Sequence, residues 1–233
     1  RGIIMATTAM CSSFKQELLC GGHCFLATQA AVSATGVNGQ FTLTALASTA
    51  NLAVGMAVTG ANVAAGAVIA SVDSATQVTL SKAHTGAVAS VTFTADVFKI
   101  LLIKVAPALT FDSTQTNVGT PGAGASSSTN VGTDEVTGTN YTSGGVTLTN
   151  VNPDLSGTTA KTSFGANPSW ASASFSATAA IIYNSSTRLG GAVPLNGRTV
   201  SVHDFGGTQT VTAGTFTLVL PTNDAANAIL RIA

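Results

Sequence analysis

The chain has 233 residues, nine of them basic and nine acidic, so its formal net charge is zero. Charged residues make up 8% of the chain, against about 25% in an average soluble domain, while the apolar share of 45% is ordinary. This balance argues against a nucleic-acid binder, which needs surplus basic residues to neutralise phosphates. A weakly charged surface with little self-repulsion is instead typical of a subunit held in an assembly.

A short helix is predicted near the N-terminus, over residues 14–20. Ser13 followed by Gln16 has the form of a capping box, and the glycine pair after the helix provides a C-terminal stop. Phe14 and Leu18 lie one turn apart and give the helix a narrow apolar face. Two turns are too few to be stable alone, so we expect the helix to dock on the rest of the protein.

Most of the remaining chain is predicted to form short strands. Apolar residues alternate with Thr or Ser, which is the pattern of strands with one buried face. The clearest runs are residues 42–46, 90–94, 145–149, 199–203 and 214–220. Turn signals such as Gly206-Gly207 recur about every ten residues, and residues 117–130 have the composition of an exposed loop. The predicted fold class is all-β, a β-sandwich with one short N-terminal helix.

The middle of the chain has its own composition. Residues 32–95 contain only two charged residues, Asp73 and Lys82, and we expect three or four strands there. The sequence therefore predicts a small β-module, residues 32–95, inserted into a main β-sandwich domain formed by residues 1–31 and 96–233. One continuous sheet system is the alternative.

No membrane segment is predicted. The most apolar stretch, residues 97–109, is interrupted by Lys99 and Lys104 and is too short to span a bilayer. The N-terminus lacks the apolar core of a secretory signal.

The last residues are unusually apolar for a chain end. We expect Ile229, Leu230 and Ile232 to be buried, either as a strand of the same sandwich or against a neighbouring subunit. These three residues are therefore candidates for packing or assembly.

Cysteine and histidine cluster near the N-terminus. Cys11, Cys20, His23 and Cys24 lie within 14 positions, and three thiols with one imidazole match a Cys3His zinc set. The C-x8-C-x2-H-C spacing is not a familiar zinc finger, so we favour buried, reduced cysteines. A disulfide among Cys11, Cys20 and Cys24, within or between subunits, is the second alternative, and zinc is the third.

Two acidic motifs are further candidate sites. His203-Asp204 could supply a general base, but neighbouring strand residues point to opposite faces, so a solvated strand end is preferred. Asp134-Glu135, the one adjacent carboxylate pair, could contribute to a calcium site but lacks the calcium-loop pattern, so a solvated loop is preferred.

The remaining candidates have structural interpretations. His84 is expected at the surface and Trp170 in the core, and Asn140 and Asn184 begin N-x-[ST] sequences. The chain has no Walker A, G-x-G-x-x-G or H-E-x-x-H motif. We therefore predict no catalytic residues, no cofactor and no bound metal.

Several segments resemble a family of tailed-bacteriophage virion structural proteins. The resemblance rests on ATTAMCSSFKQELL (residues 6–19), DVFKI (96–100), NVGTDEVTGTNYTSGG (130–145), AIIYNSS (180–186), DFGG (204–207) and TNDAANAILRIA (222–233). It covers roughly residues 6–31 and 96–233, and in that family the first block runs directly into the second, which implies that the middle segment is an insertion. Residues 54–81 separately resemble a short β-module common in phage surface proteins.

The resemblance implies a non-enzymatic structural subunit on the exterior of a phage particle, made in the host cytoplasm. We favour a capsid decoration (cement) protein; the alternatives are a tail, collar or fibre component, or a carbohydrate-binding or adhesion module. The expected partners are further copies of the chain, most simply as a trimer, and the major capsid protein or other virion proteins. Neither nucleic acid nor a membrane is an expected partner.

Overall fold

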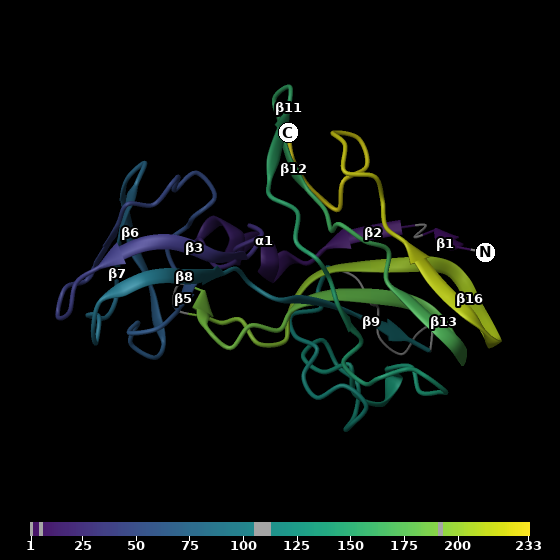
Figure 1. Cartoon of the computed structure of the whole chain (residues 1–233). Coiled ribbons are helices and arrows are strands. Elements are labelled where there is room, and N and C mark those ends of the chain that lie inside the picture. Colours follow the sequence, from purple (N-terminus) through teal and green to yellow (C-terminus); the bar gives the residue numbers. More distant parts are fainter. Residues whose placement is uncertain (1, 5–6, 105–112, 191–192) are drawn as a thin grey trace. The chain divides into compact units, whose positions relative to one another are not determined.

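The computed structural model of the chain describes residues 2–4, 7–104, 113–190 and 193–233 (Figure 1). It is all-β with one short α-helix among the described residues, as predicted from the sequence. The chain divides into two compact units: unit 1, Arg1–His23 with Val97–Ala233, and unit 2, Cys24–Asp96. Unit 2 is thus one continuous segment, and both of its flanks belong to unit 1.

The predicted module boundary at residue 32 is placed too late. It falls inside strand β3 (Gln29–Gly36), which pairs with β8 (Val88–Thr94) from its first residue, Gln29, opposite Phe93. The backbone N–H of Cys24 donates to the Asp96 carboxylate at 2.9 Å, so the two ends of unit 2 are tied together. Residues 24–31 carry no charged side chain either, so the composition gave no reason to separate them from residues 32–95.

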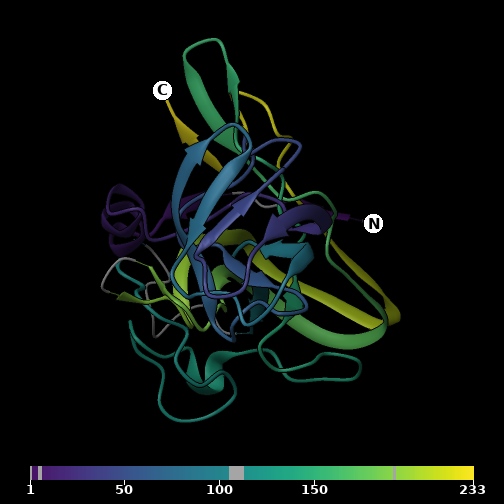
Figure 2. The same cartoon turned by 60° about the vertical axis from the view of Figure 1, so that its left-hand side comes forward.

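Unit 2 is a closed barrel of six strands, where the sequence predicted three or four (Figure 2). The strands lie in the order β3-β4-β7-β6-β5-β8, and β8 pairs with β3 to close the barrel. Besides β3 and β8 they are β4 (Thr42–Thr44), β5 (Ala57–Thr59), β6 (Ala67–Ser74) and β7 (Gln77–Leu80). Inward-facing side chains such as Leu43, Ile69 and Phe93 are fully buried and fill the interior, while Thr and Ser alternate with them outside.

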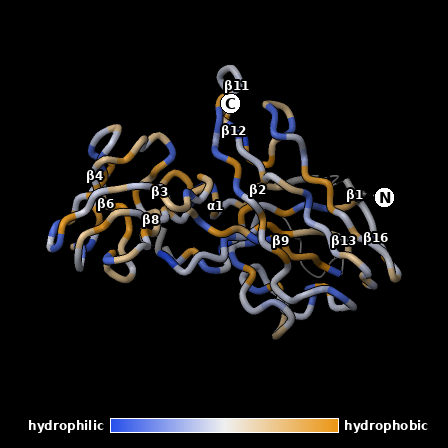
Figure 3. The backbone as a smooth tube through the Cα atoms, in the orientation of Figure 1, coloured by the Kyte–Doolittle hydropathy of each residue, from blue (hydrophilic) through white to orange (hydrophobic). Residues whose placement is uncertain are grey.

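Unit 1 is built on a six-stranded sheet with the order β1-β16-β13-β9-β10, in which β2 also pairs with β16. Its strands are β1 (Gly2–Ile4), β2 (Thr7–Met10), β9 (Phe98–Ile103), β10 (Val146–Thr147), β13 (Ser169–Asn184) and β16 (Arg198–Val219). Strand β9 covers the start of the apolar stretch 97–109, and hydrophobic colour follows it in Figure 3; residues 105–109 lie outside the described residues. β9 lies between β13 and the two-residue β10, and Ile100, Leu101, Leu102 and Ile103 have no exposed surface.

The two predicted strands 199–203 and 214–220 are parts of one strand, β16. Gly206-Gly207 is therefore not a turn between strands. The pairing with β13 shifts there: Ala177 lies opposite Gln209 and Ala179 opposite Asp204, so a bulge lies between these two pairs. Because the bulge bends the strand without ending it, the same residues that signal a turn in the sequence serve here to curve a long strand.

The buried face of the predicted strand 214–220 is confirmed. Phe216, Leu218 and Leu220 are all buried, and Phe216 packs against Trp170 and Phe175 with ring centroids 5.9 and 5.0 Å away. This aromatic cluster fills the space beside β13 and β16. Trp170 is a core residue, as expected.

Two smaller sheets complete unit 1. One has the order β11-β12-β17, with β11 (Asp154–Ser156), β12 (Thr159–Thr162) and β17 (Leu230–Ile232). The other pairs β14 (Leu189–Gly190) with β15 (Val193–Pro194), and a 3-10 turn, η1, spans Gly132–Asp134. Residues 117–130, predicted as an exposed loop, form turns joined by isolated bridges.

Helix α1 (Ser12–Leu19) begins one residue before the predicted cap. Its N-cap is Cys11, no side chain caps it, and the Ser13 hydroxyl is buried without a partner among the described residues, so the predicted capping box is wrong. The predicted glycine stop is confirmed: Gly21 has φ +70°, its N–H donates to Leu18 O and the next N–H to Glu17 O, the two bonds of a Schellman motif.

Candidate functional site

The three-stranded sheet of unit 1 carries an exposed row of apolar side chains. Leu155 pairs with Ala160, and Ala160 pairs with Ile232, so all three project from one face. Leu155 is 68% and Ile232 60% exposed, although large apolar side chains on a small sheet are normally covered. We call Leu155, Ala160 and Ile232 the apolar row.

The opposite face and the edges of this sheet are polar. Asp154, Lys161 and Arg231 lie side by side in register, and Lys161 Nζ is 3.5 Å from the Asp154 carboxylate. β11 and β17 are the outer strands, so each presents backbone N–H and C=O groups that no described strand pairs. The sheet therefore has a free edge beside an exposed apolar face. A further strand could pair with this edge, and a partner surface could cover this face.

The base of the same face is buried, so the three terminal apolar residues expected to be buried differ in their exposure within the chain. Ile229 and Leu230 are 8% and 6% exposed, as predicted, but Ile232 is not buried within this chain. Leu230 and Ile232 lie on the same face of β17, but Leu230 is in the core and Ile232 is in solvent. The strand therefore leaves the core between these two residues.

The structure does not gather the predicted zinc ligands. Cys11 and Cys20 are the N-cap and C-cap of α1, at opposite ends of the helix, and Cys24 belongs to unit 2. No group of metal-ligating side chains occurs among the described residues. The structure has no disulfide between the three cysteines; Cys11 and Cys24 are buried and Cys20 is exposed.

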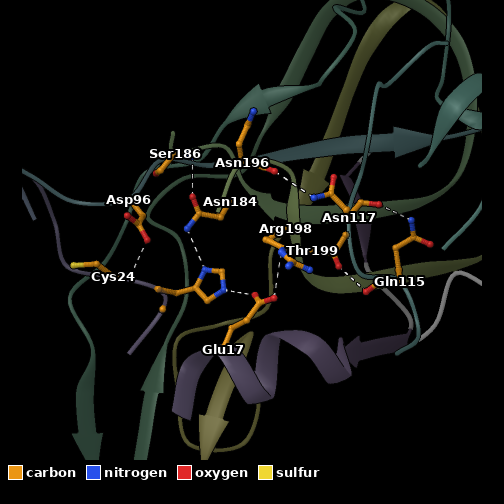
Figure 4. Close-up of polar contacts among 12 residues, drawn as sticks. Glu17, Cys24, Asp96, Gln115, Asn117, Asn184, Ser186, Asn196, Arg198 and Thr199 are labelled. Atoms are coloured by element: carbon orange, nitrogen blue, oxygen red, sulfur yellow. Dashed lines mark hydrogen bonds and ion pairs between the residues drawn. The ribbon is translucent and has the colours of Figure 1, made fainter. Parts of the chain in front are cut away.

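His23 instead belongs to a buried polar network with residues from α1, β13 and β16. Figure 4 labels three members of this network, Glu17, Asn184 and Arg198. Its Nε2 lies 2.8 Å from Glu17 Oε2, and its Nδ1 lies 3.0 Å from Asn184 Nδ2. The other oxygen of Glu17 is 3.4 Å from Arg198 Nε. The network attaches the helix to the main sheet, and neither ring nitrogen of His23 points to a substrate site.

A second buried carboxylate organises a recess on the main sheet. Glu135 has no exposed surface, and its carboxylate accepts hydrogen bonds from Tyr141 Oη at 3.0 Å, Ser143 Oγ at 2.6 Å and the Gly144 N–H at 2.6 Å. The expectation of a solvated Asp134-Glu135 loop is therefore wrong for Glu135. The carboxylate is used to hold the turn at Ser143-Gly144.

The recess has a volume of about 350 Å³. Lys99 of β9 and Tyr183 of β13 are register partners and both line it, and the turn at Ser143-Gly144 lines it as well. Tyr183 Oη donates to Gly144 O at 2.7 Å. Burial, with a smaller contribution from the Glu135 charge, raises the pKa of Tyr183 to about 12, so its hydroxyl keeps its proton at neutral pH.

The other candidate residues have structural environments. His203 is fully buried in the interior of β16, not at a solvated strand end, and Asp204 is exposed and accepts from the Gly206 N–H. They do not form a dyad, as the alternation of strand residues predicted. His84 was expected at the surface but is 2% exposed, with Nε2 3.0 Å from Thr42 O.

The two N-x-[ST] asparagines differ. Asn140 is exposed, whereas Asn184 is fully buried in the His23 network and is inaccessible to modification in the folded protein.

Sequence reasoning missed Glu17, Glu135 and Asn184 as buried polar residues. A carboxylate on the apolar side of a short helix, and a carboxylate followed within nine residues by Tyr, Ser and Gly, were visible signals. Neither identifies a partner, because the groups that satisfy a buried carboxylate are fixed by tertiary structure.

The only α-helix among the described residues has eight residues, and it is not long and apolar enough to cross a bilayer. Comparisons of the chain with protein-family models, with curated proteins and with solved structures give no match.

Proposed function

We propose that the chain is a non-enzymatic structural subunit of a tailed-phage virion, and by preference a capsid-exterior decoration protein. The observation that carries the proposal is the apolar row beside the free edge of β17, in which Leu155 and Ile232 are exposed and Ala160 is half-buried. Apolar side chains beside an unpaired edge favour aggregation in a free monomer, whereas in a lattice they are covered by a neighbour.

The surface chemistry supports the same proposal. With 8% charged residues and no net charge, the chain has few of the lysines that normally protect strand edges. Such a surface associates readily, so the proposed partners are further copies of the chain, arranged as a trimer, and the major capsid protein.

A tail, collar or fibre component is the alternative position within the particle, because the same apolar row would serve there. An adhesion module that stacks sugars on aromatic rings is less well supported. Trp170 and Tyr183 are 4% and 5% exposed, and among the described residues Phe41, at 48%, is the one aromatic side chain that is exposed.

The first test is the association state in solution. We expect the wild-type chain to self-associate at micromolar concentration in sedimentation velocity. The double variant Leu155→Asp/Ile232→Asp should be monomeric with an unchanged circular dichroism spectrum. Leu19→Asp is the matched control, because Leu19 is an exposed leucine (89%) outside the apolar row; it should associate like the wild type.

The second test asks where the chain is found. Antibodies raised against it should label particles purified from cultures that carry its gene, and gold labelling on the head rather than the tail would support the decoration role. A wild-type chain that is monomeric, and that mass spectrometry does not find in purified particles, would contradict the proposal.

A further inference from the structure

The recess on the main sheet presents one unpaired positive charge. Lys99 is half-buried, and its ammonium makes no hydrogen bond or ion pair with any described residue. The nearby carboxylate, Glu135, is buried behind the turn at Ser143-Gly144 and is already satisfied by three donors. A partly desolvated ammonium without an acidic partner favours an anionic group from outside.

The hydroxyl groups of the recess restrict the ligand further. A hydroxyl has one proton to donate and two lone pairs to accept with. Ser143 donates its proton to Glu135, the nearer of its two acceptors, since Pro121 O lies 3.1 Å away. Tyr183 donates to Gly144 O, and Ser185 donates to Val97 O at 3.0 Å. All three hydroxyls are therefore left with lone pairs, so they are acceptors for a ligand that brings its own O–H donors.

The walls of the recess are built before any ligand arrives. Asn117 Nδ2 donates to Asn196 O at 3.2 Å, and Asn117 Oδ1 accepts from the Gly119 N–H at 2.7 Å, so one side chain joins two of the lining turns. Gly197 has φ +82°, and a Cβ there would collide with Asn117, so the turn requires glycine. The side-chain amide of Asn196 makes no hydrogen bond with a described residue and can both donate and accept.

We propose that this recess binds a small hydroxylated carboxylate, a sugar acid of about one ring, with its carboxylate on Lys99 and its hydroxyls on the lone pairs of Ser143, Tyr183 and Ser185. The volume of about 350 Å³ is at the lower end of the range of small-molecule sites, which limits the ligand to one ring. Recognition is polar, without stacking on an aromatic face, because the Tyr183 ring is buried. The site does not depend on the apolar row or on the proposed role in a virion.

The test is calorimetric titration of the full chain with three probes: glucuronate, acetate and glucose. Glucuronate carries both the carboxylate and the hydroxyls, acetate only the first and glucose only the second. We expect saturable binding of glucuronate in the millimolar range, and at least about tenfold weaker binding of the other two.

Two variants locate the site. Lys99→Met should weaken glucuronate binding at least about tenfold, because it keeps the aliphatic stem and removes the charge. The matched control is Lys104→Met, since Lys104 is a β9-flanking lysine that reaches Thr137 at 3.5 Å and does not line the recess; it should bind like the wild type. Circular dichroism checks that both variants are folded.

Three outcomes would overturn the proposal. The first is no binding of glucuronate by the folded wild-type chain. The second is equal binding by Lys99→Met and the wild type, which would place the ligand elsewhere. The third is equal affinity for acetate and glucuronate, which would show a general anion site in which the hydroxyls contribute nothing.

Discussion

Asn184 fixes the tautomer of His23. The Asn184 Oδ1 accepts a hydrogen bond from the Ser186 N–H at 2.9 Å, so its Nδ2 is the group that faces His23 Nδ1, 3.0 Å away. Nδ1 must then be the acceptor, and the proton of the neutral ring lies on Nε2, which donates to Glu17 at 2.8 Å. Asn184, in β13, thus determines which nitrogen of His23 carries the proton, and this proton forms the hydrogen bond to Glu17 in helix α1.

The first prediction is that Glu17→Ala lowers the free energy of unfolding of unit 1 by about 3 kcal/mol. The substitution leaves the buried His23 N–H without its acceptor and Arg198 without its carboxylate. Gln16→Ala, at an exposed position of the same helix, should change stability by no more than about 0.5 kcal/mol. Urea unfolding followed by Trp170 fluorescence is the measurement, because the chain has one tryptophan and it lies in unit 1. Equal losses for both variants would show that the network contributes nothing.

The second prediction is a loss of stability in mild acid caused by His203. Burial lowers the pKa of His203 to about 3, from 6.5 for the exposed group. Between these two pKa values the unfolded chain binds a proton at His203 and the folded chain does not. The contribution of the neutral, buried His203 to stability is therefore fully present above pH 6.5 and is lost as the pH falls toward 3. Between pH 7 and pH 5 the loss is about 2 kcal/mol.

The matched variant for this experiment is His203→Gln. It should lose about 2 kcal/mol less than the wild type between pH 7 and pH 5, whatever its stability at neutral pH. The comparison uses the change with pH within each protein, so other acidic and basic groups cancel. Parallel pH profiles for the two proteins would refute the assignment to His203.

The third prediction distinguishes the two ends of β17. Leu230→Ala should lower stability by about 2–3 kcal/mol, because Leu230 is 6% exposed and its removal opens a cavity at the base of the sheet. Ile232→Ala should change the stability of the monomer by about 0.5 kcal/mol or less, because that side chain is already in solvent. The same fluorescence measurement decides between them, and a similar cost at both positions would mean that Ile232 is covered in solution.

Local sequence patterns predicted the secondary structure correctly where burial follows the simple alternation of the two faces of a strand. The alternation of Phe216, Leu218 and Leu220 with polar residues identified a strand and its buried face, and glycines after a short helix identified its end. These features depend on neighbours within a few positions.

Features that depend on distant partners were not predictable. Gly206-Gly207 is a bulge because β13 pairs on both sides of it, and a sequence window there cannot show the pairing. His23 is buried beside a partner from a distant part of the chain, since Asn184 is 161 residues away. Glu135 is satisfied by Tyr141, Ser143 and Gly144, six to nine residues further on, but their spacing does not show the turn that brings these donors to the carboxylate. From composition alone such residues are predicted to be solvated, because most charged side chains in proteins are exposed.

The last prediction is that unit 2 can be deleted without unfolding unit 1 only if the deletion removes the whole barrel, including all of β3 and β8. Deleting residues 24–96 and joining His23 to Val97 through a short Gly-Ser linker should leave unit 1 with a cooperative thermal transition, because the removed segment holds its own core and its ends are tied to each other by Cys24 and Asp96. The matched control deletes residues 32–95 and leaves Gln29–Ala31 of β3 without their barrel partner β8. That variant should be less soluble, since it keeps an unpaired strand fragment. The fluorescence of Trp170 reports the folding of unit 1 in both proteins. If the first deletion removed the cooperative transition, unit 1 would need unit 2 to fold, and the division into two independent units would be wrong.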